Sequence, residues 1–336
     1  MDRIAVLIPA KHESAEAVEK PLRSVLSQKG VEIEKIVIAA GTEDDHRRFS
    51  RRFADDDIVE VVKAGGNVKG ETVNNALKRV SVRADYVFLI DAGDELSSDR
   101  YIRELLEEDA TLAFGRIRYR GRNLTGLMVG LQFDVVSSGI SFWGNVVGSA
   151  PVFTTGTLFK ATFLLEEGLP ENLAEDVTLG LTHTWRKVGF VYRADLEVWM
   201  DDPAGLKENF FQQSRWWAGM YQACAEALRS RNLPGIGFAV FVLGSFLASF
   251  LTTYVLPLMY PWTILISITG RVIYSVLAAL ECSDRRGPLW ALAVIPCQFM
   301  WTFFVEWAAV YGLVWLAIRG NVWYSPTRAS EGDDHD

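Results

Sequence analysis

The stretch Leu206–Gly219, LKENFFQQSRWWAG, divides the chain into two unlike halves. The first 120 residues are rich in Asp, Glu, Lys and Arg, whereas residues 236–318 hold very few charges. Three side chains of the stretch are spaced at i, i+3 and i+4, which places them on one face of a helix; they are Gln212, Arg215 and Trp216. The sequence therefore predicts a soluble domain that meets a membrane region at this helix.

Composition limits the domain count and the partners. With 336 residues, the chain is long enough for one large domain or two ordinary ones. A net charge of -8 argues against a nucleic-acid partner. The three cysteines (Cys224, Cys282 and Cys297) match no metal-site spacing and are odd in number, so we expect packed thiols. No signal-peptide pattern opens the sequence, so we expect the N-terminal half to stay cytosolic.

Short apolar runs alternate with helical patterns in the first half of the chain. This alternation predicts βαβ units and a Rossmann-like, parallel-rich sheet. In such sheets ligands bind beyond the carboxyl ends of the strands, so the residues after each strand are the candidates for a site. The runs that we interpret as buried strands are Ile4–Ile8, Lys35–Ala40, Ile58–Val62 and Tyr86–Ile90.

The pattern is less regular between residues 112 and 200. We expect a strand over Leu112–Tyr119, a strand-turn-strand over Pro151–Lys160, and two strands over Phe190–Arg193 and Leu196–Met200. The apolar, glycine-rich segment Leu124–Gly148 has no clear period, and a helix along the sheet and a helix along the bilayer both stay open.

The second half of the chain is long enough and apolar enough to cross a membrane. Pro257 and Pro261 divide residues 236–280 into two segments of roughly 20 residues, each able to span a bilayer. Leu289–Ile318 is too long for one upright span, so we expect one tilted helix or a re-entrant segment and a span. Arg271 is costly in a bilayer, so we expect it to face protein, water or lipid phosphate, or to touch an acceptor. Basic residues flank both ends of the last segment, which favours two cytosolic ends.

The chain is therefore divided into four parts. The membrane part holds three apolar segments, with a re-entrant fourth left open, and the acidic end is expected to be a cytosolic tail. The four parts are a cytosolic α/β domain over 1–205, an amphipathic interface helix region over 206–234, transmembrane helices over 235–320 and the tail over 321–336.

Carboxylates follow the fourth strand and precede a later helix. Asp91 and Asp94 end a buried strand and could hold Mg²⁺ or Mn²⁺, since these ions prefer hard oxygen ligands. A strand-end turn with an Asp cap is the alternative. Asp176, after Glu175, could act as a general base on a hydroxyl, whereas an acidic helix N-cap would leave the pair structural.

Cationic and aromatic side chains complete the candidate set. Lys69 precedes a helix start near Glu71, where an anion can bind, although a surface lysine gives the same pattern. Arg215 offers a planar donor fork for phosphate oxygens, and Trp216 offers a platform for a sugar ring. A membrane-interface helix would also favour Arg and Trp, but it does not explain Gln212.

The order of these signals is more specific than any one of them. The chain resembles the family-2 glycosyltransferases, and most closely the membrane-integrated branch with cellulose, chitin and hyaluronan synthases and ceramide glucosyltransferase. The resemblance covers about residues 3–220, and Trp323–Arg328 is similar too. The motifs are Pro9-Ala10-Lys11-His12-Glu13, Lys69 to Asn74, Asp91-Ala92-Gly93-Asp94, Gly156, Glu175-Asp176 and Gln212-Gln213-Ser214-Arg215-Trp216.

This resemblance implies a GT-A type domain and a metal-dependent, inverting hexosyltransferase. It would move a sugar from a nucleotide sugar, most often a UDP-sugar, to a lipid or a growing polysaccharide in the bilayer, with Mg²⁺ or Mn²⁺; homo-oligomers stay open. The implied roles are Asp176 as base; Pro9, Ala10, Glu13, Lys69, Asp91, Gln212 and Arg215 at the donor; Thr155, Gly156, Thr157, Glu175 and Trp216 at the acceptor; and Asp91 and Asp94 at the metal.

Two positions depart from the family pattern. The second strand ends in Ala39-Ala40-Gly41 where the family usually has an aspartate pair, and Gly93 stands where an aspartate is usual, with Asp94 one residue later. These departures support a second hypothesis, a catalytically silent scaffold subunit that binds a sugar nucleotide. The presence of Asp176 together with Arg215 favours the enzyme.

Overall fold

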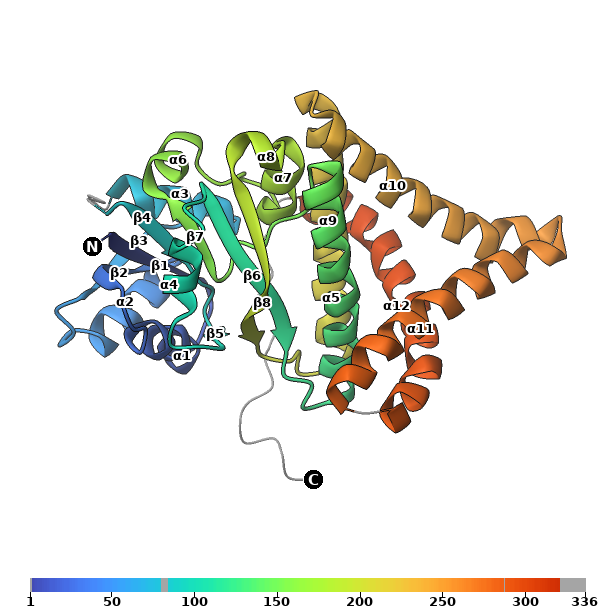
Figure 1. The fold of residues 1–336 in the computed structure, drawn as a ribbon, viewed down its shortest axis with the longest axis horizontal. Coiled ribbons are helices and arrows are strands. Elements are labelled where there is room, and N and C mark those ends of the chain that lie inside the picture. The colour runs from blue at the N-terminus through green and yellow to red at the C-terminus, as the bar shows by residue number, and fades with distance from the viewer. Residues whose placement is uncertain (1, 80–83, 287, 321–336) are drawn as a thin grey trace.

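The chain folds into an α/β domain with a helical region beside it, as the ribbon in Figure 1 shows. The computed structural model describes residues 2–79, 84–286 and 288–320. The expected cytosolic tail and its Trp323–Arg328 motif lie outside these residues.

In the described part of the chain, eight strands form a single mixed sheet in the order β3-β2-β1-β4-β7-β6-β8-β5. The first four in that order pair in parallel, as the βαβ pattern predicted. In the other half, β7 runs antiparallel to both β4 and β6. The strands are β1 Arg3–Ala10, β2 Glu32–Ala40, β3 Val59–Lys63, β4 Tyr86–Leu89, β5 Glu95–Leu96, β6 Leu112–Tyr119, β7 Thr157–Lys160 and β8 Phe190–Met200.

Helices cover both faces of this sheet. Apolar residues of α1, α2 and α4 pack on one face, and those of α3, α5 and α7 on the other. Ser14 and Thr42 cap the N-termini of α1 and α2. Their side chains accept hydrogen bonds from the backbone N–H groups of Ala17 and Asp45, respectively. The helices of this domain are α1 Ala15–Leu26, α2 Glu43–Arg52, α3 Lys69–Arg79, α4 Tyr101–Leu106, α5 Leu124–Phe142, α6 Ala161–Glu167, α7 Glu175–Thr182 and α8 Trp185–Val188.

Two sequence predictions for the mixed half were wrong. Pro151–Lys160 forms only the strand β7, because the chain bends before it and Gly156 takes a φ of 63°. The two strands expected after Phe190 are one continuous strand, β8, with a register shift opposite Gly115 and Arg116. The irregularity that the sequence pattern indicated is therefore a bulge in the pairing.

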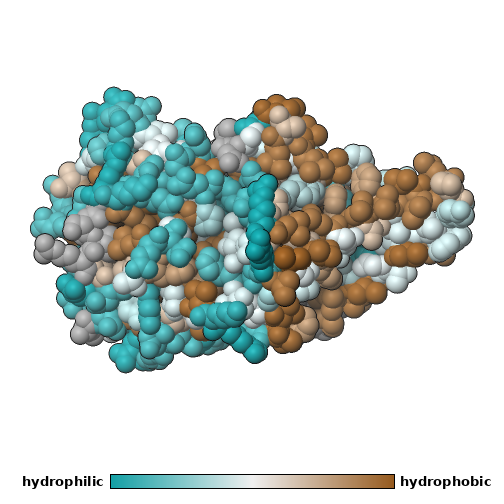
Figure 2. Space-filling view, turned by 90° about the horizontal axis from the view of Figure 1, so that it is seen from above, coloured by the Kyte–Doolittle hydropathy of each residue, from teal (hydrophilic) through white to brown (hydrophobic). Residues whose placement is uncertain are grey.

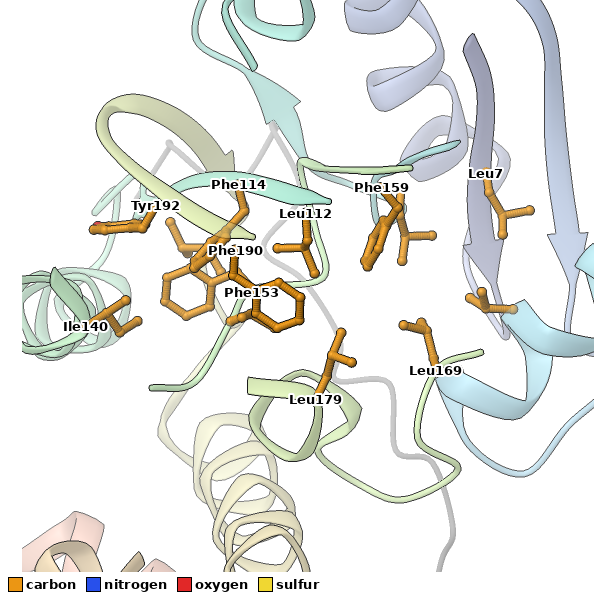
Figure 3. Close-up of a cluster of buried hydrophobic side chains, with 14 of the residues drawn as sticks. Leu7, Leu112, Phe114, Ile140, Phe153, Phe159, Leu169, Leu179, Phe190 and Tyr192 are labelled. Atoms are coloured by element: carbon orange, nitrogen blue, oxygen red, sulfur yellow. The ribbon is translucent and has the colours of Figure 1, made fainter. Parts of the chain in front are cut away.

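The apolar core on the face of the sheet covered by α3, α5 and α7 is rich in aromatic side chains. Figure 3 shows Phe114, Phe153 and Phe159 between the sheet and the segments that carry Ile140 and Leu179. Phe114 meets Phe153 edge to face, with ring centroids 6.0 Å apart. This contact holds the segment before β7 against strand β6 of the sheet.

The segment whose location the sequence left open lies along the sheet. Helix α5 contacts β6 and β8 and continues as the π-helix η1, Trp143–Val147. Its Asp134 is fully buried and pairs with Arg118 at 2.6 Å and with Arg116 at 3.2 Å, both on β6. A buried carboxylate with two cationic partners ties this helix to the sheet.

The helical region begins with α9, Leu206–Ser230, and continues in three apolar helices. The prolines at 257 and 261 separate the first two of these, as expected. The segment expected over 289–318 is one continuous helix with Pro296 inside it. The three are α10 Leu233–Phe250, extended by η2 Leu251–Val255 and η3 Leu256–Leu258; α11 Ile264–Arg286, preceded by η4 Pro261–Thr263; and α12 Pro288–Arg319.

Within the described residues, four helices are long and apolar enough to cross a membrane, namely α5 with η1, α10 with η2 and η3, α11 with η4, and α12. Figure 2 shows apolar surface gathered over the helical side and polar surface over the sheet domain. The predicted α/β domain followed by an apolar helical region is therefore confirmed, and the four helices indicate a membrane protein. Cys224 is a buried thiol, whereas Cys297 is exposed; the side chain of Cys282 lies outside the described part.

An ion pair joins the last two helices. Arg271 of α11 donates to Glu306 of α12 at 2.6 Å, and both residues are buried. Arg271 also donates to the hydroxyls of Ser267, Thr302 and Thr253, so it faces protein, one of the alternatives expected for it. These bonds satisfy a charge that would be costly in an apolar region.

Removing one member of this pair should be more harmful than removing both. We expect Arg271→Met to destabilise the protein by about 3–5 kcal/mol, because Glu306 is left buried without its cation. The double variant Arg271→Met with Glu306→Met should lose less. Thermal unfolding in detergent measures both, and a double variant as unstable as the single one would contradict this account.

Candidate active site

A pocket lies at the carboxyl ends of β1, β4 and β8, where a parallel sheet places its ligands. Pro9, Asp91 and Met200 form its floor, and α7 and α9 close it from the other side. Its volume is about 150 Å³, which is below the ≈300–1,000 Å³ of most ligand sites. Charged side chains fill the remainder of the space.

Lys69 lies at the centre of these charges. Its ammonium is 2.6 Å from Asp91 Oδ1, 2.8 Å from Oδ2 and 3.4 Å from Glu175 Oε1. It also donates to Thr154 Oγ1 at 2.9 Å. Burial lowers the pKa of Lys69, but the charges of Asp91, Glu175 and Asp176 outweigh burial, and the pKa is raised above its ordinary value. The Lys69 side chain is therefore a cation only 12% exposed in an acidic pocket, and the alternative of a surface lysine does not hold.

Asp176 lies in the first turn of α7, and the N-cap position of this helix is occupied by Ala174. Asp176 is therefore not an N-cap residue, which was the structural alternative to a role as base. Its Oδ1 accepts the backbone N–H of Val177 at 2.8 Å. Burial and the charge of Glu175 raise the pKa of Asp176 to about 7, and Lys69, the Val177 N–H and Arg215 only partly oppose them. A carboxyl with a pKa near neutrality can both accept and release a proton.

Helix α9 presents three side chains to the pocket. Arg215 donates to Leu173 O at 3.4 Å, and within the described ranges its Nε has no hydrogen-bond partner. Burial lowers the pKa of Arg215, while the charges of Glu175, Asp176 and Asp91 oppose that effect. Gln212 is buried, and its Oε1 has no partner among the described residues. Buried polar groups without partners are costly, so these two are suited to a polar ligand.

Trp216 contributes an aromatic wall. Its ring meets that of Phe133 of α5 edge to face, with centroids 5.3 Å apart and an interplanar angle of 70°. The Phe133 contact fixes the indole at the side of the pocket.

The structure brings together ten of the side chains that the sequence nominated. The ten that line the pocket are Pro9, Glu13, Lys69, Asp91, Thr155, Glu175, Asp176, Gln212, Arg215 and Trp216.

The other four nominated residues lie behind the wall. Ala10 and Thr157 are fully buried in the core. Gly156 adopts a positive φ, and a Cβ there would lie 2.2 Å from Val198 Cγ2, so its glycine has a structural reason. Asp94 is fully buried and accepts the hydroxyl of Thr155 at 2.6 Å. The ligand-binding roles of these four stay predictions.

Of the two carboxylates predicted to hold a divalent cation, Asp91 lines the pocket and Asp94 does not. Asp91 faces the pocket, whereas Asp94 lies behind Thr155, which in turn accepts the backbone N–H of Asp91. Among the residues that the structure covers, no group of three or more His, Cys, Asp or Glu could hold a metal. An ion could fit here only with further oxygen ligands from a bound substrate, as Mg²⁺ usually has.

The sequence analysis missed several wall residues. Asp201-Asp202-Pro203 follows β8 as Asp91 follows β4, so the strand-end rule could have identified it. Asp202 accepts the N–H groups of Gly121 and Arg122, which indicates a structural role. Thr154 bridges Lys69 and Glu175, donating to Glu175 Oε1 at 2.9 Å. No local pattern distinguishes it from its neighbours.

The sequence of the chain was compared with protein families and with known proteins. The sequence model of the family described as "Glycosyltransferase like family 2" matches residues 2–219. Among curated proteins no sequence matches the chain.

Two solved structures resemble the fold. S. aureus TarS has a TM-score of 0.44, 14% identity and coverage of 92% of both chains. Glucosyl-3-phosphoglycerate synthase of Mycobacterium tuberculosis, crystallised with Mn²⁺, uridine diphosphate and phosphoglyceric acid, has a TM-score of 0.40 and 17% identity, over 57% of this chain and 68% of that one. Neither similarity is close enough to decide a function.

The raised pKa of Asp176 should be visible in stability. Because the folded pKa of about 7 exceeds the ordinary 3.8, wild type should lose stability as pH rises from about 4 to about 7, and nothing further above that. Asp176→Asn, which cannot ionise, should gain stability relative to wild type over the same window. Unfolding temperatures at pH 4.5, 6 and 8 measure this, and an unchanged difference would contradict the assignment.

Proposed function

The chain belongs to the glycosyltransferase like family 2, and on that premise we propose that it transfers a sugar from a UDP-sugar to a hydroxyl of a membrane acceptor, with inversion. One observation carries the proposal. Asp176, Lys69 and Arg215, more than 140 residues apart at the extremes, line one pocket. A base and two cations are the groups that the displacement of a nucleoside diphosphate needs.

The cations are suited to the leaving group. Lys69 is a point charge, and Arg215 is a planar fork whose Nε lacks a partner in the described chain. A diphosphate in the pocket would compete with Asp91 for Lys69 and would satisfy Arg215. As the bond from the anomeric carbon to the diphosphate breaks, these charges stabilise the oxygen that leaves.

Asp176 is suited to activate the acceptor. In its ionised form it takes the proton of the attacking hydroxyl while that oxygen bonds to the anomeric carbon from the side opposite the diphosphate. A single displacement inverts that centre. Trp216 offers an apolar face to the sugar at the acceptor side.

A divalent cation would be held by Asp91 together with oxygens of the donor. When bound, it supplies positive charge beside the leaving diphosphate.

We propose that the helical region anchors the catalytic domain at the cytosolic surface of a bilayer. Helices α10 and α11 project away from the sheet domain in Figure 1, and large apolar side chains are exposed along both. Helices α5 and α12 contact α11 and elements of the catalytic half along their length. This arrangement supports a hairpin of α10 and α11 as the membrane-crossing unit, with α5, α9 and α12 lying at the bilayer surface.

A silent scaffold that binds sugar nucleotides is the second candidate. The favouring observation is that Lys69 already engages both oxygens of Asp91. A pocket closed in this way could bind without turning over.

Turnover decides between the two. Full-length protein in native membranes, given a panel of UDP-sugars with Mn²⁺, should yield a glycosylated product detectable by mass spectrometry. Asp176→Asn should lower the rate by roughly 10²–10⁴-fold, because it removes the base, and should still bind UDP. Glu226→Gln, outside the pocket, is the matched control. Folded wild-type protein that binds UDP but yields neither product nor donor hydrolysis would support the scaffold.

The pH dependence of kcat/KM should report Asp176 in the free enzyme. We expect the rate to fall as pH drops through about 7, because protonated Asp176 cannot accept a proton. Glu175→Gln should move this limb to lower pH, since the charge of Glu175 raises the pKa of Asp176. A limb that stays in place in Glu175→Gln would contradict the assigned cause.

A further inference from the structure

The carboxylate of Asp176 has little support from other elements. Among the described residues it accepts only the backbone N–H of Val177, at 2.8 Å, which belongs to the same helix. The backbone at the start of α7 therefore decides where this carboxylate lies. That start is not capped by a side chain, because Ala174 occupies the N-cap position. The contacts that fix residues 172–174 thus also place Asp176.

Helix α9, which lies beside α7 in Figure 1, binds both backbone polar groups of Leu173. Gln222 Oε1 accepts the N–H of Leu173 at 3.1 Å, and Arg215 Nη1 donates to its carbonyl at 3.4 Å. Gly219 lies between these two on the same face, since i, i+4 and i+7 share one side of a helix. A Cβ on Gly219 would lie 2.5 Å from Ala174 Cβ, so α9 packs directly against the segment that leads into α7.

Other residues hold the remainder of this segment. The side chain of Leu173 is buried in a cluster with Trp315 of α12. Asn172 accepts the N–H of Ala174 at 3.1 Å and donates to Thr178 Oγ1 at 2.8 Å. The N–H of Leu173 itself depends on Gln222, and a buried N–H that loses its acceptor is costly.

Gln222 acts from outside the active-site pocket. The described residues that line the pocket include Asn172 and Leu173 but not Gln222. Gln222 instead lines a separate groove with Thr178, and this groove shares only Asn172 with the pocket. A donor bound in the pocket would therefore reach Arg215 but not Gln222. Of the two side chains that hold Leu173, Gln222 is thus the one that can be replaced without removing a donor contact.

From this geometry we propose that Gln222 is a positioning residue: by accepting the Leu173 N–H, it holds the start of α7 where the Asp176 carboxylate meets the attacking hydroxyl. This role rests on the proposed function, since it takes Asp176 as the base. It adds to the reaction a residue that touches no substrate and lies beyond residue 219, where the family match ends.

Three variants separate the accepting oxygen from the rest of the side chain. Gln222→Leu is similar in size but cannot accept the Leu173 N–H. Gln222→Met is a second variant of this kind, in case the branched side chain prevents folding. Gln222→Glu keeps an accepting oxygen at the same distance from the backbone.

The sheet domain offers a matched control. Gln28 Oε1 accepts the N–H of Ile102 at 3.0 Å, between the end of α1 and α4. Neither residue is among the described residues that line the active-site pocket. Gln28→Leu therefore removes the same type of hydrogen bond away from the reaction. It should lower the unfolding temperature and leave kcat unchanged.

The first measurement compares turnover of the UDP-sugar that wild type uses, in native membranes, with calorimetric binding of UDP in nanodiscs. We expect Gln222→Leu and Gln222→Met to lower kcat about 10- to 100-fold, because a base displaced by about 1 Å is no longer aligned with the hydroxyl. Both should bind UDP as wild type does, because Lys69 and Arg215 are unchanged. Gln222→Glu should recover most of the lost rate.

The second measurement needs no turnover. Hydrogen–deuterium exchange over residues 172–178, followed by mass spectrometry of the full-length protein, should be at least about tenfold faster in Gln222→Leu, since a lost buried hydrogen bond is worth that factor. Gln222→Glu and Gln28→Leu should exchange there like wild type.

Exchange or kcat that Gln222→Leu leaves unchanged would overturn the proposal, and so would a Gln222→Glu variant as slow as Gln222→Leu. A loss of UDP binding that matches the loss of kcat would also overturn it, since Gln222 would then support the donor and not the base. A wild-type protein that turns over no UDP-sugar would mean that the proposed function had failed. The exchange measurement would still decide whether Gln222 holds the start of α7.

Discussion

The partly buried ammonium of Lys69 connects the elements that form the site. It bridges the end of β4, through Asp91, and the start of α7, through Glu175, and it contacts Thr154 ahead of β7. Among the described residues, six carboxylates line the pocket with two cations, Lys69 and Arg215, so negative charge is in excess. Burial, together with the charge of Glu175, explains why Asp176 keeps a proton up to about neutral pH.

The same excess of negative charge limits how an anionic ligand can bind in the pocket. A diphosphate adds negative charge, so it can enter only where a cation is redirected or another is added. In the proposed reaction, Lys69 would turn from Asp91 towards the phosphates, and an ion on Asp91 would offset the change.

Much of the fold and the site could be predicted because both depend on periodicity and on strand ends. The parallel half of the sheet follows from buried apolar runs, and Asp91, Asp176 and Arg215 followed from their positions in an ordered set of motifs. Asp94 and Gly156 were different. Their sequence positions suggested ligand contacts, but tertiary packing turns Asp94 towards Thr155 and sets Gly156 against Val198. The cavity between α5, α9, α10, α11 and α12 could not be predicted from the sequence. Five separate helices form it, and no local sequence pattern determines how far apart these helices lie.

The C-terminal end of α12 packs against the catalytic half, and this contact affects where the chain could be truncated. Trp315 is almost fully buried in a cluster with Val68, Leu173 and Ala218, and Val68 directly precedes Lys69. Gly312 lets α12 approach α9 so closely that a Cβ would lie 2.8 Å from Ser214 O. The family match ends at residue 219. A chain that ended there would lack Trp315, so Val68, Leu173 and Ala218 would be exposed to water, and the start of α3 at Lys69 would lose this packing. The packing of the catalytic half is therefore completed by side chains of α12, which lie beyond the matched region.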